Sequence, residues 1–449
     1  MKLIFQTLLF LGFNCALFGQ HAIGHYQVTF QDPDRGNRDI QTEIYYPATT
    51  AGDNTPAASG QFPVIVFGHG FVMAWDAYEN LWTEFVPRGY IMVFPRTEGN
   101  AFSTDHQEFG WDLQFLVTEL QNEGMNSSSP INGVVHPNTA LMGHSMGGGA
   151  SFLAADSLCT NGNTNLKTLV GLAPAESTTN GVSSILSARE VTVPSVILSG
   201  SSDGVTPPTD HHIPMYDSLA SDCKTFVSIT GGAHCYFANS NFNCDFGEAT
   251  SSSGISISRA DQHSVTFDFV NNWLDYTLKD DCAAFQAFQD SVQMSPRITS
   301  NQSCITNPTS SISEANGVLT SSVSGLSYQW YLDGSVISGA NSISYTPSTA
   351  GDYTVEVTFA DGCPTTSAPY TFTPSSSGIQ ENQHKLSFYP NPTKGLIQIG
   401  ETLEKVKIYN AQGMHITTIY NSNQLDFSDY PAGIYLILVE DMYYKVIKE

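Results

Sequence analysis

The sequence predicts an α/β domain built on a doubly wound, mainly parallel sheet, followed by two small all-β sandwich domains. Continuous apolar runs rich in β-branched residues recur between residues 62 and 229, and segments of helical periodicity separate them. After about Pro296 the helical periodicity stops, and Ser, Thr and Gly punctuate short strands instead. A chain of 449 residues is also too long for one ordinary domain.

The charge composition limits the partners that the chain can have. It carries 17 Lys and Arg against 42 Asp and Glu, a formal net charge of −25. A strongly acidic protein is repelled by nucleic acid and by anionic membrane surfaces, so we expect neither as a partner. Charged residues make up only 13% of the chain, whereas Ser, Thr, Asn and Gly are abundant, as is typical of exported β-rich proteins.

Residues 1–20 have the composition of a signal peptide, because Lys2 precedes a short apolar run that ends in Gly19-Gln20. No later run is long and apolar enough to span a bilayer. Removal of Cys15 with this peptide leaves seven cysteines, and export favours disulfides among them. The odd number leaves at least one thiol outside any pairing within the chain. Two candidate pairs are Cys304 with Cys363, which flank the first β domain, and Cys235 with Cys244.

The first domain, residues 21–296, contains alternating strands and helices. Residues 25–47 have the pattern of an antiparallel hairpin. The apolar runs that predict the sheet are Phe62–Gly68, Tyr90–Phe94, Thr139–Met142, Leu166–Leu172, Pro194–Leu198 and Thr225–Ile229. Helical spacing predicts helices over Trp75–Arg88, over residues 109–120 and over Phe267–Leu278, the last of which closes the domain. This alternation predicts a parallel sheet covered on both faces.

The most informative motif is Gly143-His144-Ser145-Met146-Gly147, a G-x-S-x-G pattern between an apolar run and a helix of small residues. In this strand–turn–helix context the serine is the expected nucleophile, because the sharp turn holds its hydroxyl clear of the backbone. Glycines before and after the serine allow the strand and the helix to pass closely. The helix N-terminus also stabilises an oxyanion that forms nearby.

A serine hydroxyl needs a base to activate it, and the base needs an orienting carboxylate. With this motif the acid and the histidine follow the serine along the chain. Asp203 follows a buried strand, and His234 follows another strand and a Gly-Gly turn, so the sequence predicts the triad Ser145, His234 and Asp203. The competing acids are Asp210 and Asp217, and the competing bases are His211, His212 and His263. We interpret His69 and His144 as packing or hydrogen-bonding neighbours of the turn.

The predicted oxyanion hole needs two backbone N–H groups. Met146 supplies one as the residue after the nucleophile, and Phe71 supplies the other from the loop after the early strand. The rings of Phe71 and Trp75 are expected to form apolar walls of the cleft. The interval between Ser145 and Asp203 already holds a helix and two strands, so we expect no large lid and an open cleft.

The remaining residues predict two β domains joined by a linker. Residues 297–374 contain the run YQWY and further short strands, which predict an immunoglobulin-like sandwich with Trp330 in its core. Residues 375–384 are polar and predict a linker. Residues 385–449 contain several more short strands and predict the second β domain.

Residues 26–282 resemble the bacterial cutinase and polyester-hydrolase branch of the α/β-hydrolases. The matching stretches are FPVIVFGHGF, TALMGHSMGGGA, TVPSVILSGSSDGVTPP and GGAH. The resemblance implies the same triad and oxyanion hole, and hydrolysis of carboxylic esters without a metal or cofactor. Relatives that degrade aromatic polyester carry a tryptophan where this chain has Ala175. The resemblance therefore places Ala175 at the substrate and implies a preference for aliphatic polyesters.

Residues 386–449 resemble the type A sorting domain of the type IX secretion system. The matching residues are Tyr389-Pro390-Asn391-Pro392, Val406–Asn410, Gly413, Gly433-Ile434-Tyr435 and Lys445–Lys448. The resemblance implies that the type IX secretion machinery is a partner of this domain. It also implies that the protein is secreted or attached to the outer-membrane surface.

The motifs and the two resemblances together predict a secreted serine carboxylic-ester hydrolase that acts on ester or polyester substrates. We expect it to be a monomer. Two alternatives stay open at this point. One is a lipase or other acyl hydrolase on the same fold, and the other is an exported binding or adhesion protein without catalytic activity.

Overall fold

The computed structural model describes residues 20–177, 179–304, 307–359, 362–374 and 386–449. The predicted linker and all but the last residue of the predicted signal peptide lie outside these ranges. Of the described residues, one compact unit holds those up to 346 and those from 351 to 371, and the second holds those from 347 to 350 and from 372 to 449.

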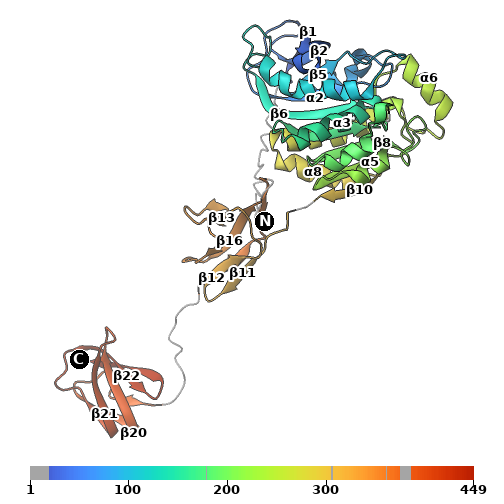
Figure 1. Ribbon diagram of the computed structural model, residues 1–449. Helices are drawn as coiled ribbons and strands as arrows, with labels where there is room; N and C mark the ends of the chain where they lie inside the picture. The colour runs from blue at the N-terminus through green and yellow to red at the C-terminus, as the bar shows by residue number, and fades with distance from the viewer. Residues whose placement is uncertain (1–19, 178, 305–306, 360–361, 375–385) are drawn as a thin grey trace, which may run out of the picture. The chain divides into compact units, whose positions relative to one another are not determined.

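The first unit contains a sheet of ten strands in the order β10-β9-β8-β7-β6-β4-β5-β2-β1-β3 (Figure 1). The neighbours from β9 to β5 are parallel, whereas β2 and β1 extend one edge as an antiparallel hairpin and β10 extends the other edge antiparallel to β9. The strands are β1 Ala22–Asp32, β2 Arg38–Ala48, β3 Gly52–Asp53, β4 Phe62–Gly68, β5 Ile91–Pro95, β6 Val135–His144, β7 Leu166–Leu172, β8 Ser195–Gly200, β9 Cys223–Ile229 and β10 Ile298–Cys304.

Helices cover both faces of this sheet (Figure 1). They are α1 Glu79–Phe85, α2 His106–Glu123, α3 Met146–Thr160, α4 Ser184–Ser187, α5 His212–Ser218, α6 Phe242–Ser251, α7 Arg259–Lys279 and α8 Cys282–Met294. Alternate residues of β4 enter two separate cores: Val64 and Val66 pack with α2 and α3, and Ile65 and Phe67 pack with α1, α7 and α8. A strand buried on both faces must be apolar at every position, which explains its continuous apolar run. The predicted doubly wound α/β fold is confirmed.

The sheet extends past residue 296, where the sequence predicts the end of the first domain. Strand β10 pairs with β9 in a register that sets Cys304 opposite Cys223, and the two form a disulfide. The predicted pair of Cys304 with Cys363 is therefore wrong, and Cys363 instead bonds to Cys282 at the start of α8. The strand is polar, with the sequence ITSNQSC, so it lacks the apolar signal of the inner strands.

The structure confirms two further expectations about the cysteines. Cys235 and Cys244 form the disulfide that closes the segment after His234, as predicted. Cys159 carries the odd thiol and is free.

Residues 312–372 form two small antiparallel sheets. One contains β11 Ile312–Ala315, β12 Val318–Ser321 and β15 Ser344–Tyr345, and the other contains β13 Ser327–Leu332, β14 Ser335–Val336, β16 Gly351–Thr358, β17 Pro364–Thr366 and β18 Tyr370–Phe372. Trp330 is fully buried, and its indole donates to the Ser342 carbonyl at 2.9 Å. It is a core residue as predicted, while the immunoglobulin-like assignment stays a prediction.

The second unit contains one sheet with its own apolar core. Its strands are β19 Phe388–Tyr389, β20 Leu396–Asn410, β21 His415–Asp426, β22 Gly433–Val439 and β23 Met442–Lys448. The core side chains come from four of these strands and the turn after β21, and include Ile397, Val406, Leu425, Phe427, Ile437 and Val446. A β-sheet-rich C-terminal domain is thus confirmed.

The start of α3 and the end of β4 meet backbone to backbone, with no room for a side chain between them. A Cβ atom added at Gly147 would lie 2.1 Å from the carbonyl carbon of Gly68 and 2.2 Å from its oxygen. Both are backbone atoms, so relief requires moving the helix away from the strand. We expect Gly147→Ala to lower the free energy of unfolding by about 3 kcal/mol, as measured by urea titration at pH 7.

The matched control is Gly247→Ala in α6, where an added Cβ meets no atom within 4 Å. Replacing an unstrained helical glycine by alanine stabilises by up to about 1 kcal/mol. An unfolding midpoint for Gly147→Ala equal to that of wild type would contradict the packing argument.

Candidate active site

Ser145 lies in the turn between β6 and α3, with φ 54° and ψ −120°. A non-glycine residue at this positive φ is strained, and two hydrogen bonds hold it in place. The Ser145 N–H donates to Leu172 O at 3.0 Å, and its carbonyl accepts from the Ala175 N–H at 2.8 Å. An added Cβ at Gly143 would lie 2.2 Å from Gly147 O, so the turn excludes any side chain there.

Asp203 follows β8 and His234 follows β9, at the carboxyl ends of the parallel strands. Ser145 lies at the same end of the sheet, after β6. The closest atoms of the acid and the histidine, His234 Nδ1 and Asp203 Oδ2, are 2.8 Å apart, and both residues are buried. The other carboxylate oxygen accepts from the N–H groups of Val205 and Thr206 at 2.9 and 2.8 Å. The carboxylate therefore has a fixed orientation toward the imidazole.

The segment that carries His234 is joined to the segment that carries Ser145 through His144. His144 Nε2 lies 3.0 Å from the His234 carbonyl oxygen, and the two imidazole centroids are 4.8 Å apart. His144 immediately precedes Ser145, so the predicted nucleophile and base lie on adjoining segments. The hydrogen bonds of the described residues include none between the Ser145 hydroxyl and His234, so that link of the triad stays a prediction.

The sequence did not predict that Thr206 would join the acid to two histidines. Its hydroxyl oxygen lies 2.9 Å from Asp203 Oδ2, 2.9 Å from His234 Nδ1 and 3.0 Å from Nε2 of His212. The far nitrogen of His212, Nδ1, lies 2.8 Å from the Ser199 hydroxyl. Asp203 and His212 are near Thr206 in the sequence, but His234 follows the next strand, so no sequence motif marks Thr206 as their shared contact.

The charge of Asp203 is maintained despite its burial. Burial disfavours the carboxylate, but the His234 imidazole and the hydrogen bonds outweigh it, and the pKa of Asp203 lies below its usual value. Burial also lowers the pKa of His212 to about 3, so this imidazole is neutral at physiological pH. The pair of Asp203 and His234 thus keeps a negatively charged acid beside the predicted base.

Among the competing bases His211, His212 and His263, only His212 joins the Asp203 network within the described residues. His69 and His144, which the sequence predicts as neighbours of the turn, contact the carbonyls of Gly70 and Thr97 and the Tyr78 hydroxyl at 2.8 Å, respectively. His211 accepts from the Glu176 N–H, and His263 contacts the Ala238 carbonyl. The competing acids Asp210 and Asp217 are exposed, and neither contacts a histidine within the described residues.

The predicted oxyanion donors lie at the start of α3 and in the loop after β4, and a hydrogen bond joins these two segments. The Gly147 N–H donates to His69 O at 3.1 Å, and the Gly70 N–H donates to the Tyr78 hydroxyl at 2.8 Å. Met146 immediately precedes Gly147, and Phe71 immediately follows Gly70. Neither of their N–H groups has a hydrogen-bond acceptor within the described residues. Their role as an oxyanion hole stays a prediction.

The three predicted substrate contacts have different surroundings. Phe71 is 50% exposed, so its ring is accessible beside the turn. Ala175 is half-buried, and its N–H is bonded to Ser145 as described above. Trp75 donates to the Tyr45 hydroxyl at 3.2 Å, and the Arg96 guanidinium lies 4.3 Å from its ring centre. These contacts occupy much of the Trp75 indole.

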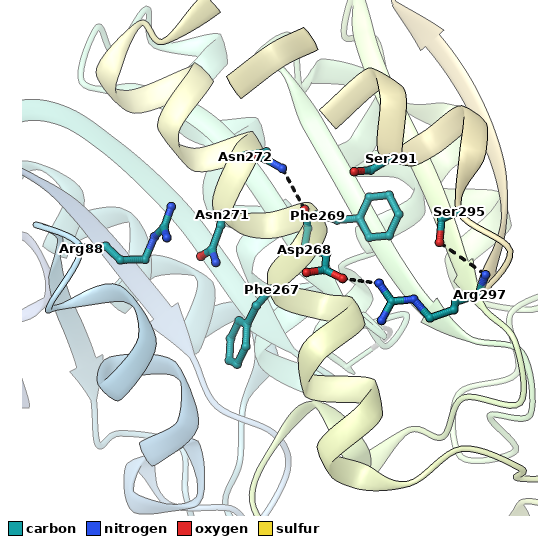
Figure 2. Close-up of a pocket in the computed structure, with 9 residues that line it drawn as sticks. All are labelled: Arg88, Phe267, Asp268, Phe269, Asn271, Asn272, Ser291, Ser295 and Arg297. Carbon is teal, nitrogen blue, oxygen red and sulfur yellow. Dashed lines mark hydrogen bonds and ion pairs between the residues drawn. The ribbon is translucent and has the colours of Figure 1, made fainter. Parts of the chain in front are cut away.

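A separate surface pocket lies between α7, α8 and the start of β10 (Figure 2). It is lined by Arg88, Phe267, Asp268, Phe269, Asn271, Asn272, Ser291, Ser295 and Arg297. Asp268 is paired with Arg297 across it, as the dashed line in Figure 2 marks. The pocket contains no histidine and shares no residue with the Ser145 turn, so it is not the predicted site.

A model of the PET hydrolase-like family matches residues 19–256, more than half of the chain. The chain belongs to this family. The match spans the Ser145 turn, Asp203 and His234, as well as α6. A model of the secretion system C-terminal sorting domain matches residues 387–449. This domain marks the protein as secreted or attached to the cell surface.

Individual relatives are more distant. Cutinase est1 of Thermobifida alba is 25% identical over 194 residues, which are 42% of this chain and 56% of the relative. Cutinase est2 of the same organism gives the same identity and coverage. Chlorophyllase-2 of Arabidopsis thaliana is 28% identical over 131 residues, 28% of this chain and 40% of the relative. The chain thus spans about half the length of these relatives.

The helices of the described residues include none with the length and apolar character that crossing a bilayer requires. The same residues contain no group of three or more His, Cys, Asp and Glu side chains arranged to hold a metal ion.

The buried His212 makes stability depend on pH. An unfolded histidine titrates near pH 6.5, so between that pH and about 3 the unfolded chain binds a proton that the folded protein does not. The free energy of unfolding therefore falls as the pH falls through this window. Between pH 6 and pH 4, wild type should lose about 1.4 kcal/mol per pH unit more than His212→Asn, as measured by urea titration.

Ser199→Ala is the matched control, because it removes a partner of His212 but retains the imidazole. It should keep the pH slope of wild type. Equal slopes for wild type and His212→Asn would contradict the assignment of His212 as a buried neutral group.

Proposed function

We propose that the protein is a serine carboxylic-ester hydrolase with Ser145 as nucleophile, His234 as general base and Asp203 as the orienting acid. The observation that carries the proposal is the 2.8 Å contact between His234 Nδ1 and Asp203 Oδ2 at the sheet edge where the strained Ser145 turn lies. The order serine, acid, histidine along the chain is that of G-x-S-x-G hydrolases.

In the proposed reaction, the Ser145 hydroxyl attacks the ester carbonyl carbon while His234 Nε2 takes its proton. The carbonyl oxygen becomes an oxyanion that accepts hydrogen bonds from the N–H groups of Met146 and Phe71 at the positive end of α3. His234 then donates the proton to the departing alkoxide, which leaves an acyl-enzyme. Water, activated by the same histidine, releases the acid and restores the serine.

Asp203 contributes by holding His234 Nδ1 protonated and stabilising the imidazolium that forms during each step. Because its pKa lies below the usual value, the carboxylate is charged at the pH where esters are hydrolysed enzymatically. The Thr206 hydroxyl contacts Asp203 Oδ2, the same oxygen that faces His234, and it also contacts His234 Nδ1. It therefore restrains both the Asp203 and the His234 side chains.

The comparisons support ester hydrolysis and suggest the substrate class. The family is PET hydrolase-like, and relatives include two cutinases and a chlorophyllase. We propose water-insoluble polyesters of the cutin type as substrates, with short soluble esters also turned over. Export through the sorting domain suits this proposal, because such polymers cannot enter a cell.

The test of the nucleophile is Ser145→Ala with p-nitrophenyl butyrate as substrate. Loss of the serine in a triad lowers kcat by on the order of 10⁶-fold, so we expect hydrolysis close to background. A fluorophosphonate should label wild type at Ser145 only, as mass spectrometry of the peptides would show. Ser127→Ala, at an exposed serine after α2, serves as the control and should retain wild-type kcat.

Two results would reject the proposal. Ser145→Ala with more than about a tenth of wild-type kcat would exclude Ser145 as the nucleophile. A folded wild type that hydrolyses no ester would instead favour the alternative of an exported binding protein. A sharp rise in rate at the solubility limit of the ester would favour a lipase.

Deleting residues 386–449 tests the role of the sorting domain. We expect the truncated protein to keep wild-type kcat on p-nitrophenyl butyrate, because this unit has its own core. In a host with a type IX secretion system it should be retained in the periplasm, as cell fractionation would show. Normal appearance in the medium would contradict this role.

A further inference from the structure

Helix α6, Phe242–Ser251, has one anchored face and one exposed aromatic face. Glu248 points inward and is 4% exposed, whereas Phe242 and Phe246 are 80% and 64% exposed. The two phenylalanines are one helical turn apart, and their rings stack with centroids 6.1 Å apart. Figure 1 shows α6 at the outer margin of the first unit.

The anchored face of α6 is hydrogen-bonded to the backbone at His234, the proposed base. Glu248 accepts hydrogen bonds from the N–H groups of His234 and Cys235 at 2.7 and 2.9 Å. Cys235 is also bonded to Cys244 in the first turn of α6 by a disulfide. An ion pair at 2.6 Å joins Asp245 to Arg259 at the start of α7. The helix therefore has a fixed position without any contribution from its phenyl rings.

The two ends of α6 contact the two loops that flank Ser145. Near its start, the Asn243 amide donates to Val72 O at 3.0 Å, one residue from Phe71. Just past its end, Ser252 accepts from the Gly204 N–H at 2.9 Å, one residue from Asp203. Helix α6 therefore lies along the rim of the proposed active site, and the exposed ring of Phe71 belongs to the same rim.

Exposure of the two stacked phenyl rings to water is unfavourable, and neither ring contributes to the core. From this placement we propose that Phe242 and Phe246, together with Phe71, form the surface on which the apolar chain of a solid polyester docks beside Ser145. The inference rests on the proposed function and assigns its substrate-docking residues. A polyester suits this surface better than a lipid bilayer, because the net charge of −25 disfavours approach to anionic membranes.

The test separates docking from catalysis by using Ser145→Ala as the background. Adsorption of Ser145→Ala to polycaprolactone particles is compared with adsorption of the same protein carrying Phe242→Ala and Phe246→Ala. Losing two exposed phenyl contacts should weaken the partition constant about tenfold. In the active protein, the double variant should release product from the particles about tenfold more slowly while keeping kcat/KM for p-nitrophenyl butyrate within twofold.

Met125→Ala is the matched control. Met125 is 74% exposed but lies near the amino ends of the parallel strands, whereas Ser145 lies at their carboxyl ends. The preceding Gly124 packs against Val135 at the start of β6, whereas Ser145 follows the end of that strand. This variant should match its parent in adsorption, in particle hydrolysis and in hydrolysis of the soluble ester.

Several outcomes would overturn the docking surface. One is unchanged adsorption of the double phenylalanine variant, and another is an equal loss on particles and soluble ester, which would indicate support of the site rather than docking. Adsorption of Ser145→Ala to phosphatidylcholine vesicles but not to particles would assign the surface to lipid. A dimer that the double variant abolishes, as sedimentation velocity would show, would assign it to a second copy. Because adsorption is measured without turnover, a failure of the proposed esterase activity is detected separately.

Discussion

The site depends on the contact between the start of α3 and the end of β4, where two backbones meet without side chains. Gly147 and Gly68 are so close that a single Cβ at Gly147 would overlap a carbonyl. This approach lets β6 turn directly into α3, forces Ser145 to a positive φ and brings the Met146 N–H beside the loop that carries Phe71. The strain is retained because the sheet, through Leu172 O, and the chain at Ala175 both hold the serine backbone.

A second constraint is the buried carboxylate of Asp203, which is accommodated only because every lone pair faces a donor. Val205 and Thr206 N–H groups take one oxygen, and His234 and the Thr206 hydroxyl take the other. Burying a charge is costly unless it is paired and hydrogen-bonded in this way. The neutral His212 completes the network by contacting the hydroxyl of Thr206. The acid is thereby rigid, which is what a base requires of the group that orients it.

The residues of the proposed triad could be predicted from the sequence because each carries a local signal. Ser145 lies in a glycine-framed motif, and Asp203 and His234 each follow an apolar run, so parallel strand topology alone brings them to one edge. Thr206 and His212 were missed as a network because nothing in the sequence shows that their side chains turn toward Asp203 and toward His234, which follows a different strand. Strand β10 was missed because an edge strand needs no apolar run, and with it the Cys223–Cys304 pairing. Helix α6 was missed because its two phenylalanines face solvent, which removes the periodic apolar face that predicts helices.

Two of the disulfides keep parts of the exported protein joined after a protease has cut the chain. Cys223–Cys304 and Cys282–Cys363 close two rings of chain, and the rings overlap because residue 282 lies inside the first. Any single peptide bond cut between residues 223 and 363 therefore leaves the two fragments covalently joined. The proposed catalytic histidine and α6 both lie within this cross-linked stretch. Outside the cell, a single protease cut within this stretch therefore does not release the segment that carries the histidine from the rest of the protein.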